Sequence, residues 1–211
     1  SPFVPLAGTW EEYLASLSGH RRSELRRRRR RLADAGAVSY EVHRGPGDLC
    51  GLLTEAFAVE ASGWKGKNGT AMASAPGTAR FYREVAAWAA ERDWLRLAFL
   101  RLDGRPLAFD LALEQGGRHY LLKTGYDPAF TSLSPGFLLR LHMLEQAFRT
   151  GLQSYEFCGA AEPWKREWAS QTRPVMLIEA YAPSAAGTLC RSADRLHRFV
   201  RTRVRRRRGE G

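Results

Sequence analysis

The stretch 118–157 constrains the fold of this chain most, because its residues predict a strand, a loop, a helix and a second strand in that order. Residues 119–124 are rich in β-forming types, and residues 126–133 are typical of a turn-forming loop. Residues 135–150 then carry apolar side chains at helical spacing before Gly151 ends the helix. A loop that enters a helix between two neighbouring strands is where α/β proteins often bind phosphate groups.

The start of this helix is the first candidate site. We place Ser134 at the N-cap and Pro135 at the first helical position, where its missing N–H is no loss. Gly136 allows a ligand to approach the backbone closely. Free N–H groups, hydroxyls and the positive end of the helix dipole together favour an anion. Ser-Pro-Gly is also a stable helix start without any ligand, so both interpretations stay open here.

The remaining elements follow from periodicity and from turn residues. The sequence predicts an extended lead-in over 2–8, helices over 10–17, 20–35, 48–62 and 78–92, strands over 38–44, 94–102, 105–114, 153–157 and 173–182, and a basic helix over 184–206. Asp103 and Gly104 give a strong hairpin signal between two of these strands. The order predicts an α+β fold, in which helices precede and interrupt an antiparallel sheet.

The net charge of +11 is concentrated in two helical segments. The first holds eight arginines, Arg21, Arg22 and Arg26 to Arg31, and the second holds nine, which end in Arg201, Arg203 and Arg205 to Arg208. In the first segment only Leu25, Leu32 and Ala33 form an apolar edge, so we expect its arginines to face water or an anion. Nucleic acid, phospholipid and phosphorylated ligands are the candidate anions, and a solvated surface is the alternative.

Other features bound the classes of function. Cys50, Cys158 and Cys190 are widely spaced and form no CxxC pair, which fits a reduced compartment and indicates neither a disulfide framework nor a zinc site. The histidines show neither metal-ligand spacing nor a catalytic triad pattern. No apolar run approaches the roughly 18 residues that cross a bilayer, and no signal peptide is visible. The chain begins at Ser1 without Met, which is consistent with a fragment of a longer protein.

The loop 63–70 is the second candidate site. It is polar and rich in glycine, yet it carries a large indole at Trp64 and the lysines Lys65 and Lys67. This combination indicates an ordered functional loop. The alternative is that Trp64 only anchors a surface loop to the core.

Several motifs follow one another in a specific order. They are SGWKGKNGTA at 62–71, FYREVA at 81–86, RPLAFDLAL at 105–113, YDPAF and SPG between 126 and 136, and EFCGAAEPWKREWA at 156–169. Together with the segment 10–32, they resemble the CelD-type acetyltransferases of the GNAT superfamily. This branch is close to the Fem-type peptidyltransferases and is associated with cellulose and exopolysaccharide biosynthesis. The resemblance covers nearly the whole chain from Trp10 to Ala182.

The resemblance implies a domain organisation and a location. N-terminal helices, including a basic linking helix, occupy 1–36, a GNAT-like core occupies 37–183, and a basic helix and tail occupy 184–211. Family members carry two GNAT-like halves, and this chain resembles the second, so an N-terminal half is an expected partner. The implied location is the cytoplasm, with peripheral attachment to the inner membrane face as an alternative.

The resemblance also implies acetyl-CoA, or another acyl-CoA, as the donor, without a metal. The loop 126–136 matches the GNAT pyrophosphate position, although it lacks the usual glycine-rich form. The implied donor-binding residues are Lys123, Thr124, Gly125, Ser132, Ser134, Pro135 and Gly136. Backbone N–H groups near Lys123 to Gly125 are expected to contact the developing oxyanion.

Attack of an amine on a thioester also needs a base for the leaving proton. Glu156 and Asp127 are the candidate bases, and Tyr126 is a further catalytic candidate. Either carboxylate is equally expected as a structural hydrogen-bond acceptor, and Asp127 before Pro128 as the start of a turn.

Four residues are implied as substrate-binding, namely Trp64, Lys65, Trp164 and Lys165. Lys165 matches the lysine that Fem-type relatives place at a substrate diphosphate. A surface charge on a loop held by tryptophans is the alternative.

Three functions stay open. The first is an acyltransferase that moves an acetyl group from acyl-CoA to an amine or sugar hydroxyl of a small molecule or glycan. The second is a Fem-like transferase that uses aminoacyl-tRNA held by the first arginine segment. The third is a non-catalytic module of GNAT fold that binds an anionic partner, RNA or a membrane surface, through its two basic helices.

Overall fold

The structure is a computed structural model that describes residues 1–63, 66, 68–69, 71–169, 171–176 and 178–208, with the backbone alone for 196 and 198–208. The chain divides into two compact units, Ser1–Pro174 and Val175–Gly211, which are considered separately. Among the described residues, no helix is long and apolar enough to cross a membrane. The division into N-terminal helices (1–36), a GNAT-like core (37–183) and a basic C-terminal segment (184–211) stays a prediction.

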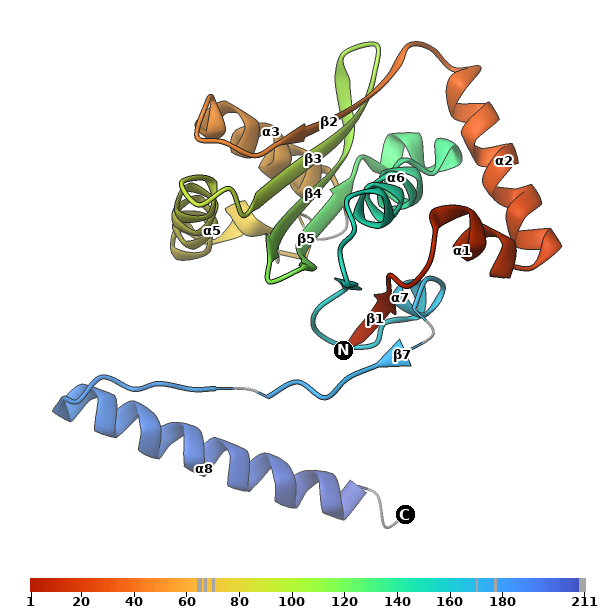
Figure 1. The fold of residues 1–211 in the computed structure, drawn as a ribbon. Helices are drawn as coiled ribbons and strands as arrows, with labels where there is room; N and C mark the ends of the chain where they lie inside the picture. Colours follow the sequence, from red (N-terminus) through yellow and green to blue (C-terminus); the bar gives the residue numbers. More distant parts are fainter. Residues whose placement is uncertain (64–65, 67, 70, 170, 177, 209–211) are drawn as a thin grey trace. The chain divides into compact units, whose positions relative to one another are not determined.

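The larger unit is built on a mixed sheet (Figure 1). Its strands are β1 (Pro2–Pro5), β2 (Val38–His43), β3 (Leu95–Leu102), β4 (Arg105–Gln115), β5 (Arg118–Tyr126), β6 (Ser154–Glu156) and β7 (Gln171–Thr172). The seven strands lie in the order β2-β3-β4-β5-β6-β1-β7. Every neighbouring pair is antiparallel except β5 and β6, which are parallel. The predicted α+β class is confirmed.

Helices cover both faces of this sheet (Figure 1). Their bounds are α1 (Trp10–Ser16), α2 (Gly19–Ala33), α3 (Leu49–Ser62), α5 (Pro76–Ala90), α6 (Pro135–Arg149) and α7 (Pro163–Arg166), with the 3-10 helices η1 (Met72–Ser74) and η2 (Pro128–Leu133). The side chains of Thr9, Ser18 and Asp48 each accept a hydrogen bond from a first-turn N–H, as expected of N-caps. Short-range sequence signals therefore set the starts of α1, α2 and α3.

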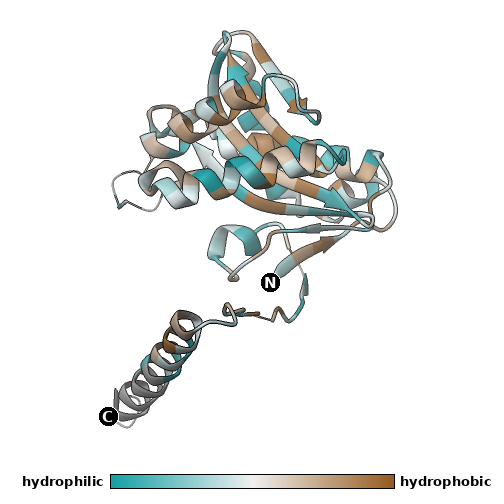
Figure 2. Cartoon of the chain, turned by 90° about the vertical axis from the view of Figure 1, so that its left-hand side faces the viewer, coloured by the Kyte–Doolittle hydropathy of each residue, from teal (hydrophilic) through white to brown (hydrophobic). Residues whose placement is uncertain are grey.

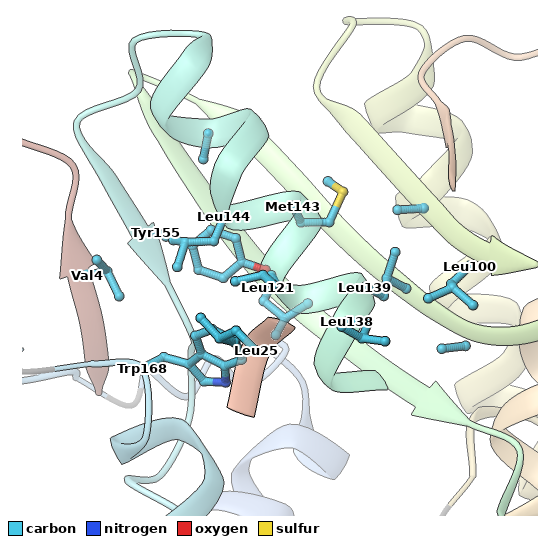
Figure 3. Packing of buried hydrophobic residues seen from close by; sticks show 14 of the residues in the cluster. Val4, Leu25, Leu100, Leu121, Leu138, Leu139, Met143, Leu144, Tyr155 and Trp168 are labelled. Atoms are coloured by element: carbon cyan, nitrogen blue, oxygen red, sulfur yellow. The ribbon is translucent and has the colours of Figure 1, made fainter. Parts of the chain in front are cut away.

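Two hydrophobic clusters hold the layers together. On one face, α6 packs with Leu138, Leu139 and Leu144 against the strands, and Tyr155 of β6 lies beneath it (Figure 3). This cluster also includes Leu25 of α2, which anchors that helix to the larger unit. On the other face, α3 and α5 pack against β3 and β4. In Figure 2 the hydrophobic colouring runs along strands in the interior of this unit.

Two predictions about strands at the sheet edge are wrong. The predicted lead-in is in fact strand β1, which lies between β6 and β7, and Val4 in it is 3% exposed. The predicted final strand over 173–182 is not formed in the part of it that the structure describes, because β7 ends at Thr172. Val175, Met176 and Ile178 are exposed instead. Alternation shows that a segment favours a strand, but it does not show which neighbour is available for pairing.

The smaller unit contains α8 (Ala185–Arg208), which confirms the predicted basic helix. Asp194 of this helix accepts a hydrogen bond of 2.8 Å from the Tyr181 hydroxyl. Leu189 is 71% exposed. The side chains of Arg201 to Arg208 lie outside the described part, so the anionic partner expected there stays a prediction.

Arg29 and Arg31 of α2 are exposed, as expected, but they and Arg21 also have partners within the chain. Arg29 pairs with Glu145 at 3.1 Å, Arg31 donates to the Ser132 carbonyl at 2.8 Å, and Arg21 donates to the Glu167 carbonyl at 2.7 Å. Acceptors far away in sequence therefore satisfy these charges, and local periodicity does not show them. An RNA or membrane partner for α2 stays a prediction.

The place of β1 inside the sheet gives a stability prediction. Val4→Ala removes two buried methyl groups beside Tyr155 and is expected to lower the free energy of unfolding by about 2 kcal/mol. Val175→Ala is the matched control, since Val175 is 64% exposed, and it should change stability by less than about 0.5 kcal/mol. Urea unfolding followed by tryptophan fluorescence measures both. Equal effects of the two substitutions would contradict the burial of β1.

Candidate active site at the divergence of two parallel strands

The parallel pairing of β5 with β6 is short. It joins Arg118 to Ser154, His119 to Tyr155 and Tyr120 to Glu156. β5 continues to Tyr126, whereas β6 ends at Glu156. The chain after β6 then adopts left-handed backbone angles at Cys158 (φ 53°) and Gly159 (φ 61°), which turn it away from the strand direction. The two strands consequently diverge beyond Tyr120.

A β-bulge lies in β5 at this point of divergence. Leu111 of β4 is opposite Lys123, and the next residue, Ala112, is opposite Leu121, so Leu122 is the extra residue. A bulge leaves backbone groups outside the regular ladder and is common next to active sites. The expected oxyanion contacts at Lys123 to Gly125 directly follow this bulge.

The start of α6 lies in the loop after β5. Ser134 occupies the N-cap position, as predicted, but its backbone is left-handed (φ 56°, ψ 46°) and its hydroxyl makes no capping hydrogen bond. The first helical bond after the cap joins the Leu138 N–H to the Ser134 carbonyl. The amides of Gly136 and Phe137 therefore precede the ladder and are available to an anion. The chain at Gly136 is close to Tyr126, since a Cβ there would be 3.2 Å from the Tyr126 ring.

Two arginines lie near the loop that leads into this helix. Arg31 of α2 reaches the Ser132 carbonyl, and Arg105 of β4, which is paired with Asp127, lies 4.8 Å above the Phe130 ring. The helix dipole adds a partial positive charge at the helix start. The predicted residues Ser132, Ser134 and Gly136 therefore lie close to Arg31 and to this dipole.

The two predicted bases already have partners. Asp127 accepts from Arg105 at 2.7 Å and from the Ala129 N–H at 3.0 Å, which is the turn-starting arrangement considered above. Glu156 is 4% exposed, accepts from the Ser154 hydroxyl at 2.7 Å and pairs with Arg173 at 3.0 Å. Both carboxylates serve as structural acceptors here, and a role as base stays a prediction for each.

Lys165 is buried, at 8% exposure, and it shapes the loop that follows β6. Its ammonium group donates to the carbonyls of Cys158 (2.8 Å) and Ala160 (3.1 Å), and it lies 5.4 Å from the Trp164 ring. A contact with a substrate diphosphate stays a prediction. Trp64 and Lys65 lie outside the described residues.

Glu60 of α3 is a candidate that the sequence analysis missed. Its side chain is 2% exposed, accepts from the Met72 N–H at 2.6 Å and lies 3.9 Å from the ammonium group of Lys123. Lys123 in turn lies 5.2 Å from the ring of Tyr82. Burial and the nearby charge of Glu60 raise the pKa of Tyr82, so its hydroxyl stays protonated at neutral pH. An acidic residue within the apolar stripe of 49–62 was the available signal.

Gly125 allows α3 to approach β5 this closely. A Cβ at Gly125 would lie 2.6 Å from the Phe109 ring and 3.2 Å from the Cα of Glu60. The end of α3 therefore packs directly on the part of β5 that follows the bulge.

A second missed group is buried under α6. Arg140 of α6 donates to Asp110 of β4, to the Tyr155 hydroxyl at 3.1 Å and to the Thr124 hydroxyl at 2.8 Å. Burial raises the pKa of Asp110, and the Arg140 guanidinium opposes that rise. Charged residues inside apolar runs, such as Asp110 in RPLAFDLAL, were again the available signal.

A surface depression of about 300 Å³ lies elsewhere, between α2, β2 and α6. Arg29, Tyr40 and His142 line it, and Tyr40 stacks on His142 at 4.3 Å. Arg29 belongs to the first arginine segment, but none of the predicted donor-binding, catalytic or substrate-binding residues lines this depression, so we do not assign it to the reaction.

Comparison with known proteins identifies the family. Residues 19–166 match the acetyltransferase (GNAT) domain family. The chain belongs to this family. The fold and the membership in the GNAT superfamily are therefore confirmed, while the CelD-type branch stays a proposal. No curated protein sequence matches the chain.

Solved structures of low sequence identity share the fold. FemX is 16% identical, with a TM-score of 0.54 over 77% of this chain and 53% of its own. A conserved protein of unknown function from Bacteroides thetaiotaomicron is 14% identical, with a TM-score of 0.54 over 79% of this chain and 52% of its own. The C-terminal domain of a putative lysylphosphatidylglycerol synthetase from Agrobacterium fabrum is 19% identical, with a TM-score of 0.50 over 79% of this chain and 47% of its own. This GNAT chain spans about half the length of these proteins.

The contact between α3 and β5 predicts an effect of Gly125→Ala. The added methyl group meets Phe109 and the Glu60 backbone, so we expect unfolding to require about 1–3 kcal/mol less free energy. Gly45→Ala is the control, because in the described part of the chain no atom lies within 4 Å of a Cβ there. Chemical unfolding of both variants checks this. A neutral Gly125→Ala would show that α3 can move away from β5.

Proposed function

We propose that this GNAT chain transfers an acyl group, with acetyl as the first candidate, from acyl-CoA to an amine or a sugar hydroxyl. The observation that carries this proposal is the uncapped start of α6 at the point where the parallel strands β5 and β6 diverge. The resemblance to CelD-type enzymes extends it to a glycan acceptor in exopolysaccharide or cell-envelope polysaccharide biosynthesis. Because the match spans only about half of these related structures, an N-terminal half is a proposed partner that completes the acceptor side.

In this proposal the donor lies along β5 and ends at α6. The diphosphate of CoA accepts hydrogen bonds from the amides of Gly136 and Phe137, where the helix dipole and nearby arginines favour negative charge. The thioester lies beside β5 beyond Tyr120, where β6 no longer pairs with that strand. Backbone N–H groups after the Leu122 bulge face the thioester oxygen.

The reaction then needs a proton acceptor and a proton donor. The acceptor nitrogen or oxygen forms a bond to the acyl carbon, the carbon–sulfur bond breaks, and CoA leaves as a thiol. We assign the acceptor's proton to Glu60, because Glu60 lies against Lys123 and Gly125, where the thioester is placed. Tyr82 is on the same side and stays protonated, so its hydroxyl can supply a proton to the thiolate.

Donor binding gives the first test. Acetyl-CoA at about 100 times its Kd should stabilise the chain by about 2.7 kcal/mol, which corresponds to a rise in Tm of about 5–10 °C for a chain of this size. Gly136→Leu should abolish the rise, since its side chain would occupy the space beside the α6 amides and Tyr126. Differential scanning fluorimetry measures both.

The chain offers a matched control for this test. α5 also begins with Pro-Gly, at Pro76 and Gly77, and no atom of the described residues lies within 4 Å of a Cβ at Gly77. Gly77→Leu should therefore keep the full response to acetyl-CoA. A wild-type chain that shows no shift, both alone and joined to an N-terminal half, would remove the acyl-CoA proposal.

The role of Glu60 gives the second test. Glu60→Gln keeps an acceptor for the Met72 N–H but cannot take a proton, so we expect turnover to fall by about 10²–10⁴-fold with little change in acetyl-CoA affinity. Release of CoA thiol from acetyl-CoA can be followed with glucosamine, which offers both an amine and hydroxyl groups. Glu55→Gln, on the same helix but paired with Arg101, is the control. Equal turnover of the two variants would return the assignment to Glu156 or Asp127.

A further inference from the structure

Arg140 connects strands β4, β5 and β6 to helix α6. Its guanidinium donates to Asp110 of β4, to Thr124 of β5 and to Tyr155 of β6, while its backbone belongs to α6. The ring of Trp164, in the loop after β6, lies 5.5 Å from the same guanidinium. Tyr155 lies in the last stretch where β5 and β6 pair, and Thr124 lies beyond that stretch. One side chain thus bridges the two strands across the point where their backbone pairing stops.

The buried Arg140–Asp110 pair is expected to add little to the free energy of unfolding. Arg140 is 3% exposed and Asp110 is fully buried, so both charges have lost their water. Within the described residues, the Nε of Arg140 and the Nε2 of the neighbouring His119 have no hydrogen-bond partner, whereas Thr124 hydrogen-bonds the Asp110 carboxylate. Buried ion pairs are frequently no more stable than apolar side chains of the same volume, and unpaired buried polar atoms make them less so. Stability alone therefore does not account for this group.

We propose that the Arg140–Asp110 pair is a positioning device that sets the separation of β5 and β6, and so holds open the gap that the acyl-CoA thioester enters. This inference rests on the proposed function. Three directional hydrogen bonds fix a guanidinium more tightly than apolar contacts do, because they specify both distance and angle. Arg140 is a positioning residue, since its guanidinium donates to side chains of β4, β5 and β6 and acts on the donor through those strands.

The test separates geometry from stability by replacing both charges together. Arg140→Met with Asp110→Val leaves no unpaired charge, so we expect the denaturation midpoint to stay equal or to rise. Acetyl-CoA affinity, measured by isothermal titration, should nevertheless fall by about 10–100-fold, because small errors in position are costly to a bound donor. A double variant that is stable and binds acetyl-CoA as tightly as the wild type overturns the proposal.

A second buried pair on the same face of the sheet serves as the control. Arg96 of β3 pairs with Glu114 of β4 at 2.7 Å, and it bridges strands that do not diverge. Arg96→Met removes this ion pair and leaves Glu114 bonded to His119 of β5 at 3.0 Å, so it should leave acetyl-CoA affinity within about twofold of the wild type. An equal loss of affinity in this variant and in the Arg140 and Asp110 variant would show a general effect of core charge and would also overturn the proposal.

Two further measurements cover the remaining outcomes. If the Arg140 and Asp110 variant does not fold, Tyr155→Phe removes a single hydrogen bond to the guanidinium and keeps the aromatic ring. A severalfold loss of affinity supports the device, and an unchanged affinity overturns it.

Hydrogen exchange of the unliganded chain tests the strand spacing without acetyl-CoA. Amides of β5 after Tyr120 and of β6 should exchange faster in the variants. Unchanged exchange overturns the spacing role, whereas a wild type that fails to bind acetyl-CoA overturns only the proposed function.

Discussion

The three-residue parallel pairing of β5 with β6 is the constraint on which the rest of the site depends. A parallel neighbour requires a crossover connection, and α6 provides it, so the start of α6 must lie at the end of β5 where that strand leaves its partner. Had the pairing continued to Tyr126, the backbone of β5 would be occupied on both sides. Because it stops at Tyr120, no described strand pairs with that side of β5 beyond Tyr120, and the α6 start that follows has no capping hydrogen bond from a described side chain.

Local signals were sufficient to predict most elements. Helix starts depend on residues within one turn, and the Asp103-Gly104 hairpin depends on two positive φ angles. Both features can therefore be predicted from the local sequence. Strand partners depend on distant residues, which explains why the sequence predicts only an extended lead-in where β1 forms.

The buried face of α5 also depends on what the helix packs against. It consists of alanines, while Phe81 and Trp88 are 57% and 43% exposed, since close packing against a sheet favours small side chains over the most apolar ones.

The residues of the candidate site also differ in whether the local sequence predicts them. Residues of the loop 126–136 were predicted because Ser, Pro and Gly have specific backbone preferences. Glu60, Asp110 and Arg140 were missed, since a single charged residue in an apolar run gives no indication of its partner. Only the fold brings Glu60 to Lys123 and Arg140 to Asp110, across 63 and 30 positions of sequence. A charge at a position where periodicity demands burial is itself the informative signal, because an unpaired charge is too costly to bury there.

The two phosphate sites suggested by the sequence, Lys165 and the start of α6, differ in the hydrogen bonds that a phosphate would have to displace. Lys165 already donates to the carbonyls of Cys158 and Ala160, so a diphosphate that recruited it would first displace charge-assisted hydrogen bonds worth about 1.5–3 kcal/mol each. It would also release the left-handed turn at Cys158 and Gly159 that these bonds hold. The first-turn amides of α6 have no intrahelical acceptor to exchange, and water is their competitor. A phosphate therefore gains more at α6 than at Lys165, unless the loop after β6 changes conformation when the acceptor binds.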